Sequence, residues 1–189
     1  MRKVTEQWLG RVGAPGRAVS GRVAGKRATL LCGGVAALLL ASPLLADEAV
    51  PGPSHGIEYP QGWQQWGTIA VSQRTDNQTI RVILGNDIAV EAARSGQTRP
   101  WPAGAKLGKV VWKAAALEQW PAALGPEQFV HAEFMVKDPA RFTDSGGWGW
   151  ARWVGLEQTP FNQGNGICVD CHTPVKGQDW VFTKPASWP

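Results

Sequence analysis

The sequence predicts a mostly β (α+β) domain, with an antiparallel sheet of about five strands and a few short helices. Three observations favour this fold class. Runs rich in β-branched and apolar residues recur along the chain, short polar or glycine-containing segments separate them, and one segment between them carries helix caps. With 18% charged and 43% hydrophobic residues, the composition excludes a disordered polyelectrolyte, a coiled coil and a multi-span membrane protein.

The expected strands follow one another with short connections. The runs that we expect to form them are residues 67–73, 79–84, 107–115, 130–137 and 148–154. The polar turn at residues 74–78 indicates that the first two strands are antiparallel. After the second strand, Asn86 or Asp87 caps a short helix. This helix runs to Arg94, and Gly96 ends it.

Residues 1–46 have the pattern of a signal peptide. The first 27 residues carry seven basic residues and one acid, and residues 28–41 carry no charge. The apolar run is shorter than the about 20 residues that a membrane span needs, and Ala46 is a small residue at a position suited to cleavage. The alternative is an uncleaved anchor whose run continues to Leu45. Cys32 lies in this segment, so cleavage removes the odd cysteine.

The mature chain differs from the whole chain in charge. The first 46 residues hold seven of the 19 basic residues and one of the 15 acids, which leaves 12 against 14 and changes the net charge from +4 to −2. The basic pI therefore belongs to the export signal and gives no reason to expect a nucleic-acid partner. Residues 47–62, rich in Pro, Gly and Glu, are predicted to be a flexible leader. Residues 63–189 form the predicted folded domain, which is long enough to bury one core.

The most specific motif is Cys168-Val169-Asp170-Cys171-His172, near the C-terminus. Two thiols at this spacing can add to the two vinyl groups of one haem while the histidine reaches its iron, so the motif is typical of covalent c-type haem attachment. A zinc knuckle needs a second cysteine pair, and a thioredoxin-like site needs a βαβ context. We therefore predict one covalently bound haem c with His172 as iron ligand, which agrees with export to the periplasm.

The residue on the other face of the iron decides whether a substrate can bind. The mature chain offers His55, His131 and Met135, and electron-transfer cytochromes c close this position with Met or His. In the strand predicted at residues 130–137, His131, Glu133 and Met135 share one face. We expect Met135 in the core and His131 at the surface or hydrogen-bonded. Glu133 is expected to face the iron, because a carboxylate beside apolar neighbours costs free energy unless it is paired or used.

The mature chain resembles the cytochrome P-460 family from about Trp66 to its end. Besides the haem motif, the segments that carry the resemblance are Asp179-Trp180-Val181-Phe182-Thr183, Glu133-Phe134-Met135-Val136-Lys137-Asp138 with Arg141-Phe142, and Gly104 five residues before Lys109. The resemblance implies a mostly antiparallel β fold, usually a homodimer, with a five-coordinate haem that is covalently linked to a lysine. It also implies oxidation of hydroxylamine to nitric oxide or nitrous oxide, with a small redox protein as electron acceptor.

By position, the resemblance makes Lys109 the cross-linking lysine and Glu133 the distal carboxylate. Lys113 has the same strand parity, and only the spacing from Gly104 favours Lys109. Hydroxylamine oxidation releases protons as well as electrons, and Glu133 can accept them as a general base. Arg152, in the last predicted strand, could pair with a haem propionate, although we expect it at the surface.

Two other functions fit the same residues. The β-sheet cytochromes c-prime, which are a related branch of the same fold, lack the cross-link and bind nitric oxide or carbon monoxide at an open iron. A six-coordinate electron-transfer cytochrome c uses Met135 or His131 as the sixth ligand instead. The coordination of the iron and turnover of hydroxylamine distinguish the three functions.

Overall fold

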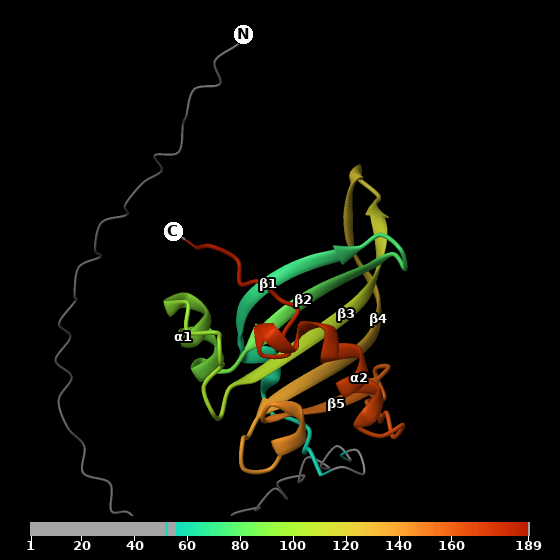
Figure 1. Ribbon diagram of the computed structural model, residues 1–189. Coiled ribbons are helices and arrows are strands. Elements are labelled where there is room, and N and C mark those ends of the chain that lie inside the picture. The colour runs from blue at the N-terminus through green and yellow to red at the C-terminus, as the bar shows by residue number, and fades with distance from the viewer. Residues whose placement is uncertain (1–51, 53–55, 189) are drawn as a thin grey trace, which may run out of the picture. The chain divides into compact units, whose positions relative to one another are not determined.

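An antiparallel β-sheet dominates the computed structural model, which describes residue 52 and residues 56–188. Its six strands lie in sequence order, so each pairs with the next along the chain (Figure 1). They are β1 (Gly67–Arg74), β2 (Thr79–Gly85), β3 (Lys106–Leu117), β4 (Trp120–Lys137), β5 (Trp148–Val154) and β6 (Thr159–Pro160). The predicted mostly β class is confirmed, with the two-residue β6 added to the expected strands.

Short helices connect and flank the strands. They are η1 (Trp63–Gln65), α1 (Asp87–Ser95), η2 (Thr143–Ser145), α2 (Gly166–His172) and η3 (Thr173–Gln178). The caps predicted for α1 are confirmed, because Asn86 Oδ1 accepts from the Ala89 N–H at 3.1 Å and Gly96 ends the helix at φ 74°. Among the described residues, no helix has the length and apolar character needed to cross a membrane.

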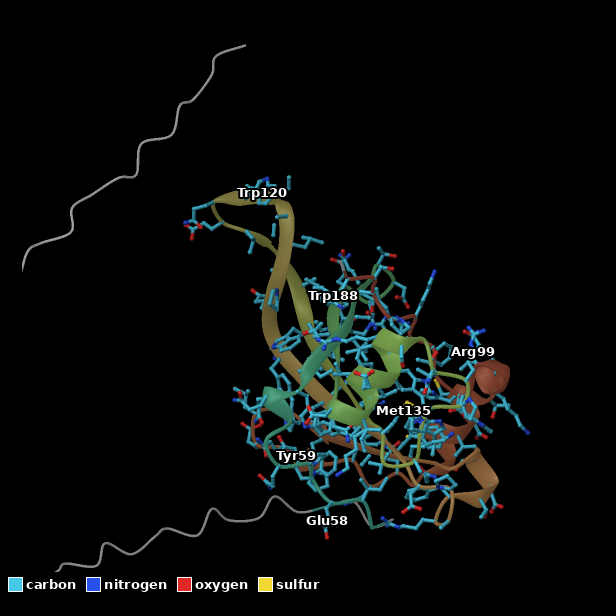
Figure 2. The ribbon with its side chains drawn as sticks, turned by 90° about the vertical axis from the view of Figure 1, so that its left-hand side faces the viewer. Glu58, Tyr59, Arg99, Trp120, Met135 and Trp188 are labelled. Atoms are coloured by element: carbon cyan, nitrogen blue, oxygen red, sulfur yellow. The ribbon has the colours of Figure 1, made fainter. Side chains whose placement is uncertain are left out.

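The strand predicted at residues 130–137 is longer than expected, since β4 begins at Trp120. The end of β3 and the start of β4 form a two-stranded arm that extends past the rest of the sheet (Figure 1), with Trp120 near its tip (Figure 2), because β2 begins at Thr79, opposite Lys113. Pro121 and Pro126 disfavour the prediction of a strand in this segment, because proline has no backbone N–H to donate to a neighbouring strand. In the arm they are tolerated, because no described strand pairs with the outer edge of β4 there and needs their missing N–H groups.

Side chains alternate along the strands and divide the core between the two faces of the sheet. On β4, Phe134 is fully buried in one cluster, whereas Met135 packs against the other. On β5, Trp153 packs with the Phe134 cluster, and Trp148 and Trp150 belong to the cluster on the Met135 side. Large indole rings therefore fill both faces of the sheet, as their apolar area favours.

The chain is already packed before residue 63, where the sequence places the start of the folded domain. Ile57 and Tyr59 are buried, and the Tyr59 ring lies 5.1 Å from that of Trp153 and 6.0 Å from that of Phe134. These apolar side chains have partners on the sheet although prolines and glycines surround them in sequence. The predicted signal peptide, residues 1–46, lies outside the described residues.

Gly149 on β5 lies against the ring of Phe142, and adding a methyl group there should destabilise the protein. A Cβ atom at this position would lie 2.4–2.7 Å from three ring carbons. Because Phe142 packs against a buried cluster, Gly149→Ala should lower the free energy of unfolding by about 1–3 kcal/mol, measured by denaturant titration of tryptophan fluorescence. Gly177→Ala is the control, since nothing lies within 4 Å of its Cβ position. Equal losses in both variants would contradict the packing argument.

Candidate functional site

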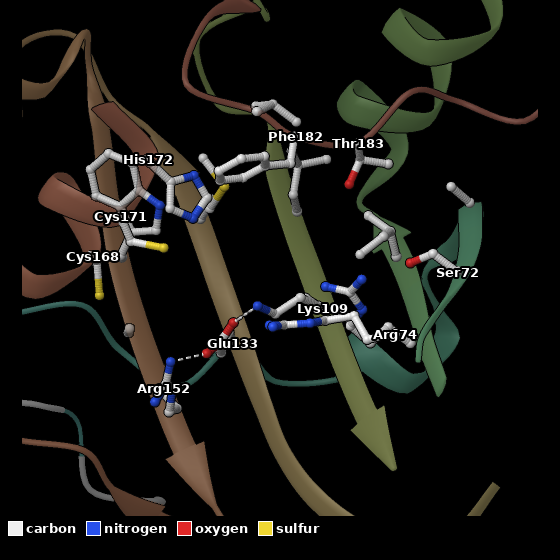
Figure 3. Close-up of a pocket in the computed structure, with 18 of the residues that line it drawn as sticks. Ser72, Arg74, Lys109, Glu133, Arg152, Cys168, Cys171, His172, Phe182 and Thr183 are labelled. Carbon is white, nitrogen blue, oxygen red and sulfur yellow. Dashed lines mark ion pairs between the residues drawn. The ribbon is translucent and has the colours of Figure 1, made fainter. Parts of the chain in front are cut away.

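A cavity of about 630 Å³ lies on the face of the sheet that carries Met135, beneath α2 and the C-terminal segment (Figure 3). Its volume is within the range of about 300–1,000 Å³ that is usual for small-molecule and cofactor sites. The residues predicted for the site that line this cavity are Lys109, Glu133, Cys168, Cys171 and His172. The fold therefore brings all five predicted residues to one cavity.

The helix α2 presents both thiols of the motif to the cavity. Cys168 and Cys171 are free and three positions apart, so they lie on the same side of the helix. Cys168 is partly buried, which raises the pKa of its thiol, and Cys171 is exposed. The Trp150 N–H donates to Asn165 Oδ1 at 3.4 Å, which ties the start of α2 to β5.

His172 ends α2 and is held in one orientation. Its Nδ1 lies 2.6 Å from the Trp180 carbonyl oxygen. Because a carbonyl only accepts, Nδ1 carries the proton and Nε2 keeps its lone pair, which is the tautomer that binds a metal. The rings of Trp150 and Phe182 lie 5.4 and 5.1 Å away. Burial lowers the pKa of His172 despite the opposing hydrogen bond to Trp180, so the ring is neutral as a ligand must be.

On the sheet side of the cavity, three charged side chains stand side by side on adjacent strands. Lys109 on β3 pairs in register with Glu133 on β4, and Glu133 pairs with Arg152 on β5. Both cations form ion pairs with the carboxylate (Figure 3), and His131 Nε2 lies 3.5 Å from its Oε1. Glu133 is the most enclosed of the ion-paired three, with 17% of its side chain exposed against 33% for Lys109 and 32% for Arg152.

These neighbours determine the charge of the carboxylate. Burial by itself raises the pKa of Glu133, but Lys109, Arg152 and His131 outweigh it, so the pKa lies below its ordinary value. Burial also lowers the pKa of His131 to about 4, although Glu133 opposes this change. At neutral pH the cavity is therefore lined by an ionised Glu133, which has a neutral His131 as its neighbour.

The residues that the sequence offered as alternative iron ligands, cross-linking lysines or haem partners lie at different positions relative to the cavity. Met135 lines the cavity and packs against the core, as expected, and His131 contacts Glu133. Lys113 is exposed and does not line the cavity, while His55 lies outside the described residues. Arg152 contacts Glu133 and lies over the ring of Phe161 rather than at an open surface, a placement that depends on strand register and that the sequence pattern does not reveal.

Three further cations line the cavity, and no sequence pattern assigned them to the site: Arg74, Arg81 and Lys184. Figure 3 shows Arg74, with Ser72 and Thr183, across the cavity from the cysteines. Arg74 and Arg81 lie on the two strands of the first hairpin, and a pair of basic residues there also fits charges that point to solvent. No pattern indicates Lys184.

The donor set of the cavity fits a c-type haem. Two adjacent thiols, a neutral imidazole with Nε2 unprotonated and an apolar lining match its vinyl groups, iron and porphyrin ring. A haem carries two carboxylates on the edge away from its vinyl groups. The positive charges of Arg74, Arg81 and Lys184 in the cavity lining are suited to pair with these carboxylates. Each part of the cofactor thus has a chemically suitable neighbour in this cavity.

The comparisons with known proteins agree with this fit. A family model described as cytochrome P460 matches residues 60–183, a range that contains the sheet, α2 and the predicted site residues. No curated protein matches the chain.

Proposed function

The chain belongs to the cytochrome P460 family and is a c-type cytochrome with one covalently bound haem c, and we propose that it oxidises hydroxylamine to nitric oxide or nitrous oxide. The observation that carries this proposal is the placement of Glu133, whose carboxylate lines the cavity with 17% of its side chain exposed and pairs with Lys109 and Arg152. An electron-transfer site needs no such group, because outer-sphere electron transfer involves no proton acceptor, and the ion pairs with Lys109 and Arg152 offset the cost of burying the carboxylate without giving it a catalytic use. A substrate that loses protons gives the carboxylate a use.

In this proposal each residue of the cavity has one role. Cys168 and Cys171 hold the haem through two thioether bonds, and His172 binds its iron through Nε2. The haem, when bound, supplies an iron that accepts electrons from hydroxylamine. Glu133 accepts the protons that hydroxylamine releases, and Arg152 keeps its carboxylate oriented toward the cavity. The electrons then leave to a small redox protein.

Turnover tests the proposal directly. Purified holoprotein mixed with hydroxylamine and an excess of a small oxidant should consume hydroxylamine and release nitric oxide or nitrous oxide in repeated cycles. Protein that binds nitric oxide or carbon monoxide but consumes no hydroxylamine would instead have the function of a β-sheet cytochrome c-prime. Absence of turnover in protein with a full haem content would therefore contradict the proposal.

We further propose that Lys109 is linked to the porphyrin edge. Its side chain lines the cavity and contacts Glu133, whereas Lys113, four residues along the same strand, is exposed and serves as the internal control. A protease digest of the holoprotein should join the peptide of Lys109 to the haem peptide, and mass spectrometry should find Lys113 unmodified. Haem attached to Cys168 and Cys171 alone, with an ordinary Soret band after reduction, would contradict the link.

Met135 supports a second candidate function, because its side chain also lines the cavity. If it binds the iron, the protein is a six-coordinate electron carrier. We expect a five-coordinate, high-spin spectrum instead, unchanged in Met135→Ala because this methionine packs against the core. A low-spin spectrum that becomes high-spin in Met135→Ala would identify an electron-transfer cytochrome.

The proposal includes a cellular setting. We propose export to the periplasm by the signal at residues 1–46, since c-type haem is attached outside the bacterial cytoplasm, and a homodimer as the working form. The N-terminal sequence of protein recovered from the periplasm tests cleavage near Asp47. Light scattering of the holoprotein tests the dimer.

A further inference from the structure

Two consecutive residues hold the hydrogen-bond partner of His172 in a costly backbone conformation. Asp179 has φ 52° and Trp180 has φ 64°, both in the left-handed region that non-glycine residues rarely adopt. Strained residues of this kind persist only when their surroundings determine them. Their consequence here is that the Trp180 carbonyl points at His172 Nδ1, 2.6 Å away.

A buried ion pair fixes this turn to the sheet. Lys137 Nζ lies 2.7 and 2.8 Å from the two carboxylate oxygens of Asp179, and it also donates to the Gly146 carbonyl at 2.8 Å. Asp179 Oδ2 accepts a further hydrogen bond, from the Trp101 N–H, at 2.7 Å. Lys137 is 4% exposed and the Asp179 side chain 11%, so the pair is largely shielded from water. An ion pair with this many partners holds its members in one geometry.

The position of Lys137 on β4 connects this pair to the cavity. Glu133, Met135 and Lys137 alternate along β4 and therefore share one face, and the first two line the cavity. The same strand thus carries the carboxylate of the site and, four residues later, the anchor of the turn that contacts His172. The indole of Trp180 also fits closely, because a Cβ atom on Gly146 would lie 2.4 Å from its Nε1.

We propose that the ion pair between Lys137 and Asp179 is a positioning device for the iron ligand: it holds the Trp180 carbonyl against His172 Nδ1 and thereby sets the orientation and basicity of the imidazole. The inference rests on the proposed role of His172 as iron ligand. A strong hydrogen bond at Nδ1 increases the electron donation of Nε2, which strengthens the iron–histidine bond and favours ferric over ferrous iron. Lys137 and Asp179 touch neither haem nor substrate in this role.

The test compares holoproteins that differ only in this pair. The double variant Lys137→Met with Asp179→Asn removes both charges without leaving one buried alone, and asparagine keeps an acceptor for the Trp101 N–H and tolerates the left-handed region. We expect the iron–histidine stretching band of the ferrous protein to move to lower frequency and the reduction potential to rise. Lys137→Arg, which keeps an ion pair, should restore both values toward those of the wild type.

Arg141→Met is the matched control, because it removes an exposed cation four residues from Lys137 that pairs loosely with Asp138, at 4.0 Å. Both readouts should stay at the wild-type values in this variant. If the double variant does not fold, Lys137→Gln with Asp179→Asn is measured in the same way, because it also leaves no charge buried alone and keeps a donor for the Gly146 carbonyl. A folded variant that lacks both charges of the pair and shows an unchanged band and an unchanged potential would overturn the inference, since a merely structural pair alters stability without altering the ligand.

Failure of the proposed function looks different in the same experiments. A wild-type protein with six-coordinate iron, or with no turnover of hydroxylamine, contradicts that function, while the reduction potentials of the variants still report whether the pair acts on His172. A wild-type spectrum without histidine ligation would overturn both. The two proposals can therefore fail separately.

Discussion

The double substitution Cys168→Ala with Cys171→Ala is expected to abolish covalent haem attachment completely. The haem of a c-type cytochrome is held by thioether bonds to cysteine, and these two cysteines are the ones that line the cavity. The intact mass of the purified variant should be that of the bare polypeptide, and haem staining after denaturing electrophoresis should be lost. Retention of covalent haem by this variant would contradict the assignment of the motif.

Two further variants make this result specific. Cys32→Ala removes a thiol from the predicted signal peptide and should leave the haem content unchanged. His172→Ala should keep the thioether bonds but lose the strong-field imidazole, so that the haem remains attached with an altered spectrum. The contrast separates loss of attachment from loss of the iron ligand, which a single cysteine variant does not do.

The strands were predictable wherever local pattern and packing agree. The runs that became β1, β2, β3 and β5 alternate or carry β-branched residues, and the caps at Asn86 and Gly96 satisfy helix ends by local hydrogen bonds. The arm at the start of β4 was not predicted, because the tolerance of Pro121 and Pro126 depends on which strands lie beside them. That information is in the topology of the sheet and not in the local sequence.

The site was predictable in its local part only. Five consecutive residues, Cys168 to His172, contain the whole attachment motif, so sequence alone indicates the haem. The ion pairs of Glu133 with Lys109 and Arg152 depend on the register of three strands. Lys137 and Asp179 are separated by 42 positions, and no spacing rule connects them. Their contact required the fold.

Glu133→Gln is expected to retain haem and hydroxylamine binding and to lower the turnover number by about 10²–10⁴-fold, the usual contribution of a general base. The amide keeps the size of the side chain but cannot accept a proton near neutral pH. Stopped-flow spectra of hydroxylamine binding and steady-state turnover measure the two effects separately. Glu127→Gln is the control, because Glu127 lies on the same strand, is exposed and does not line the cavity. Undiminished turnover in Glu133→Gln would remove the proposed role.

The pH dependence provides an independent check on the same carboxylate. While Lys109 is unlinked, Lys109 and Arg152 hold the pKa of Glu133 below its ordinary value of 4.5, and Arg152 still lowers this pKa once Lys109 is bonded to the porphyrin, so the proton-accepting form persists through weakly acidic pH. If Glu133 is the base, kcat/KM should stay level on acidification until the pH falls below that value, because kcat/KM reports the free protein. Arg152→Met removes one neighbouring cation, which raises the pKa of Glu133 and moves the acid limb of the profile to higher pH. The same acid limb in Glu133→Gln would assign it to another group, such as His131, whose pKa is about 4.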